Sequence, residues 1–164
     1  MFIMTKTQIR RFGKNLKEWA YSQAGDRLLC SHDCTDGACS WVAGGCVPLA
    51  LALLEVLEGS ELYAVWVKQE APPWFRGRTM PTHQLPHHVG VMLDGLFIDG
   101  LGARLPRSVE RWWASELETP KVAPVTTQSA IDIISDPPKI RDPLIDNLVG
   151  ILVPILDGIL LKSL

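Results

Sequence analysis

The segment that most constrains the fold is residues 46–59, CVPLALALLEVLEG. Pro48 suits the first turn of a helix, where its missing N–H costs nothing, and Gly59 suits the position just after a helix end. Between them lie almost only Ala, Leu, Val and Glu, so the predicted helix is apolar nearly all round. Because such a helix has no face suited to water, we expect it at the centre of the fold.

The composition favours a single globular domain. The chain has 164 residues, of which 47% are hydrophobic and 21% are charged. These values are ordinary for a soluble protein, and they exclude global disorder, a collagen-like repeat and a pure coiled coil. The formal net charge is −2. Because duplex binding needs a cluster of cations that neutralise phosphates, we expect no nucleic-acid partner.

Other segments predict the remaining elements of an α+β fold. Residues 5–20 place apolar side chains at steps of three and four with Lys and Arg between them, which is typical of an amphipathic helix. Gly25 is a plausible stop signal for it. Residues 62–68 are rich in aromatic and β-branched residues and predict a strand. We expect a helix over 108–117 and mostly irregular structure over 119–143, which is rich in Pro, Thr and Ser.

Residues 87–100, HHVGVMLDGLFIDG, predict a β-hairpin. The Asp-Gly pair at 94–95 is among the strongest two-residue turn signals, because a type I′ turn needs positive φ at both positions. A turn there pairs Gly90 with Asp99.

Side chains alternate along each strand, so this register assigns the hairpin residues to two faces. The more apolar face is expected to pack into the core, and it carries His87, Val89, Val91, Leu93, Leu96 and Ile98. The other face carries His88, Gly90, Met92, Phe97, Asp99 and Leu101. His88 and Asp99 are diagonal neighbours there, about 7–8 Å apart at the backbone. The register therefore places an acid within hydrogen-bonding reach of His88, although a polar pair on a half-exposed surface would also account for both residues.

Cys46 follows Gly44-Gly45 directly and opens the apolar helix. Unpaired N–H groups and the helix dipole at a helix N-terminus stabilise an anion, which lowers the pKa of a thiol. The backbone N–H groups of Gly45 and Cys46 are also candidates to hold a developing oxyanion. The alternative is that Cys46 is a small buried core residue, as many free cysteines are.

Taken together, Cys46, His88 and Asp99 have the residue types of a nucleophile, a general base and an orienting acid. The chain resembles compact bacterial or phage members of the papain-like cysteine hydrolase superfamily, including its transglutaminase-like branch. The likeness rests on Gly-Gly-Cys entering an Ala/Leu-rich helix, on a His-Val-x-Val strand, and on the return through IDGLG. It covers residues 44–59 and 88–102.

The resemblance implies a fold in which the Cys-bearing helix packs on a small antiparallel sheet that carries the His and the acid. It implies that Cys46 is the nucleophile, His88 the general base and acid, and Asp99 the orienting residue, with no cofactor. The expected reaction is cleavage of a peptide, isopeptide or other amide bond of a peptide or protein substrate through a thioester; hydrolysis and acyl transfer both remain open. One departure is Ser40, which stands where the papain branch has a glutamine that helps to hold the oxyanion.

Cys30, His32, Cys34 and Cys39 form a second cluster, CSHDCTDGAC. Thiolates and imidazoles at short spacing suit tetrahedral Zn²⁺, but this spacing is not one of the common zinc patterns. We therefore favour a polar loop over a metal site. A small zinc-stabilised module remains a further hypothesis.

The C-terminal segment 144–164 is strongly apolar, with LVGILVPILDGILL at 148–161. The run is shorter than the roughly 20 residues of a spanning helix and is interrupted by Gly, Pro and Asp. We therefore expect a buried or interface segment, used for docking or self-association, rather than a membrane anchor. We assign residues 1–143 to the catalytic domain and expect a cytoplasmic protein, since no secretory signal is recognisable. The alternative function is a non-catalytic interaction protein of a phage or mobile element on the same scaffold.

Overall fold

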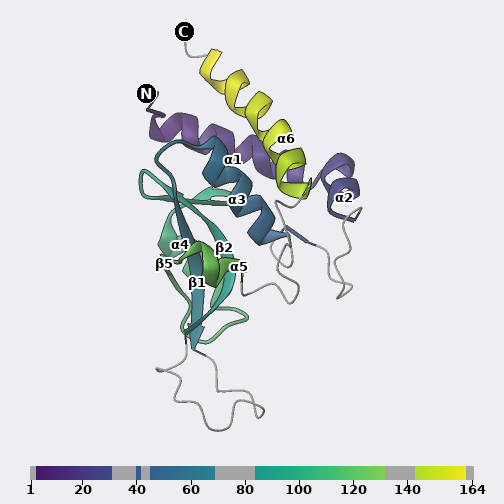
Figure 1. Cartoon of the computed structure of the whole chain (residues 1–164). Helices are drawn as coiled ribbons and strands as arrows, with labels where there is room; N and C mark the ends of the chain where they lie inside the picture. The colour runs from purple at the N-terminus through teal and green to yellow at the C-terminus, as the bar shows by residue number, and fades with distance from the viewer. Residues whose placement is uncertain (1–2, 31–39, 42–44, 69–83, 132–142, 162–164) are drawn as a thin grey trace.

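The computed structural model describes residues 3–30, 40–41, 45–68, 84–131 and 143–161. It has a mixed α+β fold in which helices pack against a five-stranded antiparallel sheet (Figure 1). The helices are α1 (Lys6–Ala20), α2 (Gln23–Cys30), α3 (Cys46–Val56), α4 (Pro106–Trp113), α5 (Thr127–Ile131) and α6 (Pro143–Leu160). The strands are β1 (Glu61–Lys68), β2 (Gln84–Leu93), β3 (Leu96–Asp99), β4 (Gly102–Arg104) and β5 (Lys121–Pro124).

The sheet has the order β4-β3-β2-β1-β5, and neighbouring strands are antiparallel throughout. The hairpin of β2 and β3 has the register expected from the sequence, with Leu93 opposite Leu96. Its turn residues Asp94 and Gly95 have φ of 47° and 75°. Positive φ at both positions is what a type I′ turn requires, so the predicted turn is confirmed.

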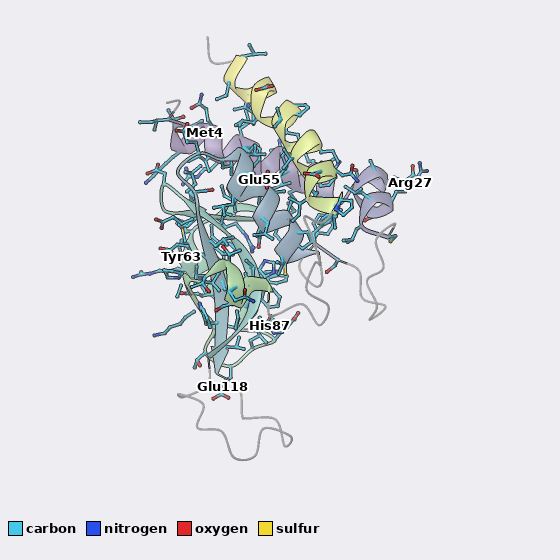
Figure 2. All side chains as sticks on the ribbon, viewed as in Figure 1. Met4, Arg27, Glu55, Tyr63, His87 and Glu118 are labelled. Atoms are coloured by element: carbon cyan, nitrogen blue, oxygen red, sulfur yellow. The ribbon has the colours of Figure 1, made fainter. Side chains whose placement is uncertain are left out.

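Both faces of the sheet are covered. Helices α1, α3 and α6 bury one face in the main core, which includes Val89 and Ile98 of the hairpin and Leu53 of α3. Helix α4 covers the other face, where Val109 and Trp113 pack with Phe97 and Val65. Figure 2 shows side chains filling the space between α1, α3 and α6. The predicted central position of the helix that begins at Cys46 agrees with this arrangement.

A β-bulge in β2 changes one detail of the predicted hairpin. Val65 of β1 lies opposite His88, but the next residue, Trp66, lies opposite Pro86, so His87 has no partner in β1. His87 is exposed, and its ring lies 5.1 Å from that of Trp113. The expectation that His87 packs into the core beside Val89 is therefore wrong, because the extra residue of a bulge interrupts the alternation.

Helix α1 begins with a capping box. The backbone N–H of Thr5 donates to the side chain of Gln8 at 2.8 Å, and the Thr5 hydroxyl accepts from the backbone N–H of Gln8 at 3.3 Å. The helix ends at Ala20 rather than at Gly25, which lies inside α2. A Cβ at Gly25 would lie 2.5 Å from the carbonyl oxygen of Trp19, so this glycine permits close packing rather than terminating a helix.

The region expected to be mostly irregular contains two short elements, β5 and α5. Strand β5 pairs with β1 at the edge of the sheet. A helix is present where 108–117 predicted one, but its bounds differ: α4 begins earlier, with Pro106 in its first turn, and ends earlier, at Trp113.

Helix α6 packs back on the body of the molecule. Its buried side chains are Leu144, Ile145, Leu148, Leu152 and Ile159, and they join the main core with residues of α1 and α3. By length and composition alone α6 would be long enough to cross a membrane, a criterion that core helices of soluble proteins also meet.

Candidate active site

Cys46 is the first residue of α3 and is 4% exposed. Gly45 precedes it as the N-cap and makes no side-chain cap. A Cβ at Gly45 would lie 2.7 Å from Cδ1 of Leu29 and 3.0 Å from the carbonyl oxygen of Ser40. A side chain at position 45 would therefore clash with its neighbours. Glycine there allows the close packing that places Cys46 at the beginning of the helix.

His88 lies on β2 with 0% of its surface exposed. Its Nε2 is 2.9 Å from Oδ2 of Asp99, the last residue of β3. The imidazole also packs against two aromatic rings, with ring centroids 5.3 Å away for Trp113 and 6.1 Å away for Phe97. The predicted diagonal pair therefore makes a hydrogen bond, and it does so in a buried setting rather than on a half-exposed surface.

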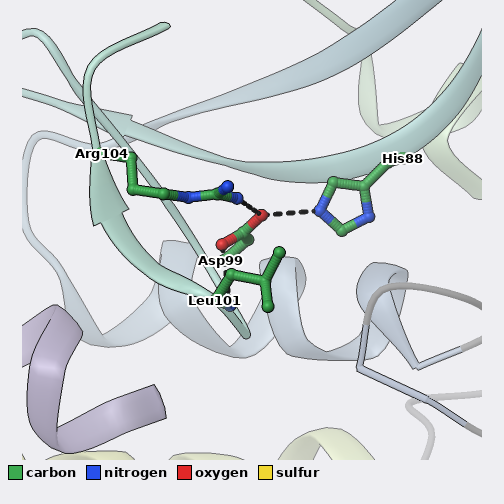
Figure 3. Close-up of polar contacts among 4 residues, drawn as sticks. All are labelled: His88, Asp99, Leu101 and Arg104. Carbon is green, nitrogen blue, oxygen red and sulfur yellow. Dashed lines mark hydrogen bonds and ion pairs between the residues drawn. The ribbon is translucent and has the colours of Figure 1, made fainter. Parts of the chain in front are cut away.

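Asp99 is 1% exposed and uses both carboxylate oxygens. Oδ1 accepts the backbone N–H of Leu101 at 2.9 Å, and Oδ2 accepts from Nη2 of Arg104 at 2.7 Å as well as from His88. Figure 3 shows Arg104 and His88 approaching the same oxygen from opposite sides. A buried carboxylate is tolerated when charged partners and hydrogen bonds surround it in this way.

The side chain of Cys46 is hydrogen-bonded to His88. Because Nε2 of the imidazole faces Asp99, Nδ1 is the nitrogen that remains for the thiol. Burial by itself raises the pKa of Cys46, but the hydrogen bond and the charge of His88, together with the backbone N–H groups of Val89 and Cys46, outweigh it. The net effect is a lowered pKa for the thiol.

The pKa of His88 changes in the opposite direction. Burial lowers it, but hydrogen bonds to Asp99 and Cys46 and the charges of both groups raise it to about 9. A thiol with a lowered pKa beside an imidazole with a raised one favours transfer of the proton from sulfur to nitrogen. These opposite directions favour the thiolate–imidazolium pair over a neutral thiol beside a neutral imidazole.

The two backbone groups proposed for the oxyanion differ in availability. The N–H of Gly45 donates to the carbonyl oxygen of Ser40 at 3.1 Å. The N–H of Cys46 lies beside its own sulfur. When this sulfur attacks a carbonyl carbon, the oxyanion that forms on the carbonyl oxygen would lie near the Cys46 N–H. The Gly45 N–H already donates to Ser40.

Arg104 belongs to the site but was not predicted from the sequence. It lies on β4 opposite Phe97, which the register already assigned to the face of Asp99. The signal that could have revealed it is the second turn of the segment, IDGLGAR, in which Gly102 has φ of 101°. A return strand through 102–104 would have placed Arg104 on the same face as Asp99.

The alternative zinc cluster receives no support from the described residues. Cys30 lies exposed at the end of α2, and His32, Cys34 and Cys39 lie outside the described residues. Among the residues that the structure does describe, no three of His, Cys, Asp and Glu are grouped as metal ligands would be.

Comparisons of the chain with family models, curated proteins and solved structures returned no match. The assignment of a function therefore depends on the geometry of Cys46, His88 and Asp99.

Proposed function

We propose that the chain is a cysteine hydrolase of papain-like type that acts on an amide, peptide or isopeptide bond through a thioester intermediate. The observation that carries this proposal is the buried arrangement of Cys46, His88 and Asp99. The thiol is hydrogen-bonded to His88, and Nε2 of His88 lies 2.9 Å from Oδ2 of Asp99. Cys46 also opens a buried helix, where the dipole and unpaired N–H groups favour its thiolate.

The reaction follows from the protonation state that the site favours. The Cys46 thiolate attacks the carbonyl carbon of the substrate, and the carbonyl oxygen becomes an oxyanion near the Cys46 N–H. The His88 imidazolium gives its proton to the leaving amine as the C–N bond breaks, which leaves a thioester on sulfur. Neutral His88 then takes a proton from water, whose oxygen attacks the thioester; the C–S bond breaks, the acid is released, and the Cys46 thiolate and the His88 imidazolium are restored. An amine in place of water would give acyl transfer by the same steps.

Asp99 has an orienting role in this scheme. Its Oδ2 accepts the Nε2 proton of His88, which leaves Nδ1 directed at Cys46 and stabilises the imidazolium. Its second oxygen is fixed by the N–H of Leu101, so the carboxylate does not turn away.

The direct test is acylation of the thiol by an activated ester. We expect p-nitrophenyl acetate to release a burst of nitrophenolate and to add one acetyl group to Cys46, detected by mass spectrometry and peptide mapping. Cys30, which is exposed, is the internal reference thiol. At pH 6 we expect acetylation at Cys46 to be faster than at Cys30, because the contact with His88 lowers the pKa of the Cys46 thiol and so raises its thiolate fraction.

Two variants complete the test. Cys46→Ala should abolish the burst while the circular dichroism spectrum stays unchanged, and Cys30→Ala should keep the burst. Acetylation that persists after the loss of Cys46, or that is slower at Cys46 than at Cys30 at pH 6, would contradict the proposal. The alternative of a non-catalytic interaction protein would then take precedence, because a binding module has no need of a reactive thiol.

A further inference from the structure

We propose that Arg104 is a positioning residue of the site. It holds Oδ2 of Asp99 in place and, by sharing that oxygen with His88, limits how strongly the carboxylate stabilises the protonated form of His88. This inference rests on the proposed function and adds Arg104 to the side chains of Cys46, His88 and Asp99. It starts from two distances on one oxygen, 2.7 Å from Nη2 of Arg104 and 2.9 Å from Nε2 of His88.

The contact between Arg104 and Asp99 is well shielded from water. The side chain of Arg104 is 20% exposed and that of Asp99 is 1% exposed. Charges in a buried setting are screened less by salt and water than surface charges are. The Nε of Arg104 is also buried and has no hydrogen-bond partner among the described residues. The ion pair with Asp99 is made through Nη2.

The guanidinium of Arg104 also has an aromatic neighbour and a nearby phenol. Arg104 lies 5.9 Å from the ring of Trp112, the residue before the one that packs on His88. Tyr21, which follows α1, lies near both charges: burial and Asp99 raise the pKa of its hydroxyl, and Arg104 lowers it. Arg104 thus contacts Asp99 and lies over the ring of Trp112, near the end of α4.

Two consequences follow for His88. The first is geometric: with Arg104 on Oδ2 and the Leu101 N–H on Oδ1, the carboxylate has one fixed orientation toward the imidazole (Figure 3). The second is electrostatic, because a cation on the shared oxygen opposes a second positive charge on His88. An imidazolium held less tightly gives its proton more readily to a leaving amine.

Among the described residues, charged and titratable groups approach His88 from several elements. Cys46 faces it from α3, Asp99 from β3, and Arg104 faces Asp99 from β4. Its neighbour His87 lies at the bulge, and Glu116, which follows α4, interacts with His87. Arg104 is the cation that contacts the carboxylate partner of His88.

The experiment measures the pKa of His88 by NMR titration of isotope-labelled histidine in the full chain, with the signal assigned by a His88→Gln protein. We expect Arg104→Gln to move the midpoint upward by about one unit, because a nearby positive charge is removed. Arg104→Lys keeps the charge and should stay near the midpoint of the unsubstituted protein. The matched control is Arg107→Gln, which removes an exposed cation nearby and should leave the midpoint unchanged.

A purely structural role would give a different result. In that case Arg104→Gln and Arg104→Lys would both lower stability, and neither would move the His88 midpoint; that result overturns the inference. If Arg104→Gln does not fold, the side-chain nitrogen signals of Arg104 in the unsubstituted chain provide the same test. They should shift at the pH at which His88 titrates, and signals that stay constant through that pH would overturn the inference.

The inference and the proposed function can fail separately. A His88 midpoint that responds to Arg104, combined with a thiol that forms no acyl adduct, would refute the hydrolase but not the role of Arg104. An acylated Cys46 with a His88 midpoint that ignores Arg104→Gln would do the reverse.

Discussion

Charges alternate along four side chains once the proton has moved from Cys46 to His88. Arg104 is positive, Asp99 negative, His88 positive and Cys46 negative, so the group is neutral as a whole. A neutral cluster with short contacts is less costly to bury than a lone charge. The near-complete burial of His88 and Asp99 is therefore compatible with ionised side chains.

At the scale of single residues, Asp99→Asn tests the orienting role. The amide keeps the shape but removes the negative charge that raises the pKa of His88. We expect the rate of Cys46 acylation to fall by at least about a hundredfold, and the His88 midpoint to move to lower pH. An unchanged rate in a folded Asp99→Asn protein would show that His88 does not need its carboxylate.

The pH dependence of turnover is a second prediction at this scale. The thiolate–imidazolium pair exists above the lowered pKa of Cys46 and below the pKa of His88, about 9. Activity should therefore decline as the pH rises through about 9, because His88 then lacks the proton that the leaving amine needs. A steady-state profile with an amide substrate measures this decline, and activity that keeps rising above that pH would contradict it.

At the scale of elements, α1 contacts β4 closely through Gly13. A Cβ at this position would collide with the backbone nitrogen of Ala103 and lie 2.5 Å from its Cβ. We expect Gly13→Ala to lower the free energy of unfolding by about 1–3 kcal/mol, measured by chemical denaturation, because the backbone of β4 has to move.

The matched control is Gly150→Ala in α6, where an added Cβ would meet nothing within 4 Å. There the higher helix propensity of alanine should raise the free energy of unfolding by roughly 0.5–1 kcal/mol. The same substitution is thus expected to have opposite signs in two helices, and equal effects would show that the α1–β4 contact is looser than described.

How much of this fold the sequence could predict depends on the element. The Asp94-Gly95 turn fixed the hairpin register, and the register brought His88 and Asp99 together, because a two-residue turn leaves little freedom to the strands that it joins. The bulge at His87 was not predictable, since it depends on how β2 pairs with a strand distant in sequence. The contact of Arg104 with Asp99 required a return strand as short as β4, which carries almost no periodic signal.

At the scale of the whole molecule, α6 covers the helix that carries Cys46. Leu148 and Leu152 of α6 are 0% exposed and belong to the same core as α3. The apolar character of the C-terminal segment is therefore partly accounted for by packing within the chain. The exposed part of α6 includes Val153, of which 40% is accessible.

This arrangement predicts how α6 responds to truncation of its side chains. Leu152→Ala should lower the free energy of unfolding by about 2–5 kcal/mol, the usual cost of a cavity in a packed core. Val153→Ala, one residue further along, should change it by no more than about 0.5 kcal/mol. Similar effects of the two substitutions in urea denaturation would mean that α6 is not anchored to the core in solution.

The most direct test of the central claim is a pH titration of the Cys46 thiolate, followed by its ultraviolet absorbance as the difference between the full chain and Cys46→Ala. This measurement needs no substrate and no access of a reagent to the buried sulfur. We predict a midpoint well below the value of 9.0 for an ordinary thiol, and a rise of that midpoint in His88→Gln, because the imidazole no longer stabilises the thiolate. A midpoint at or above 9.0 would mean that Cys46 is an ordinary buried thiol and would contradict the proposed catalytic role.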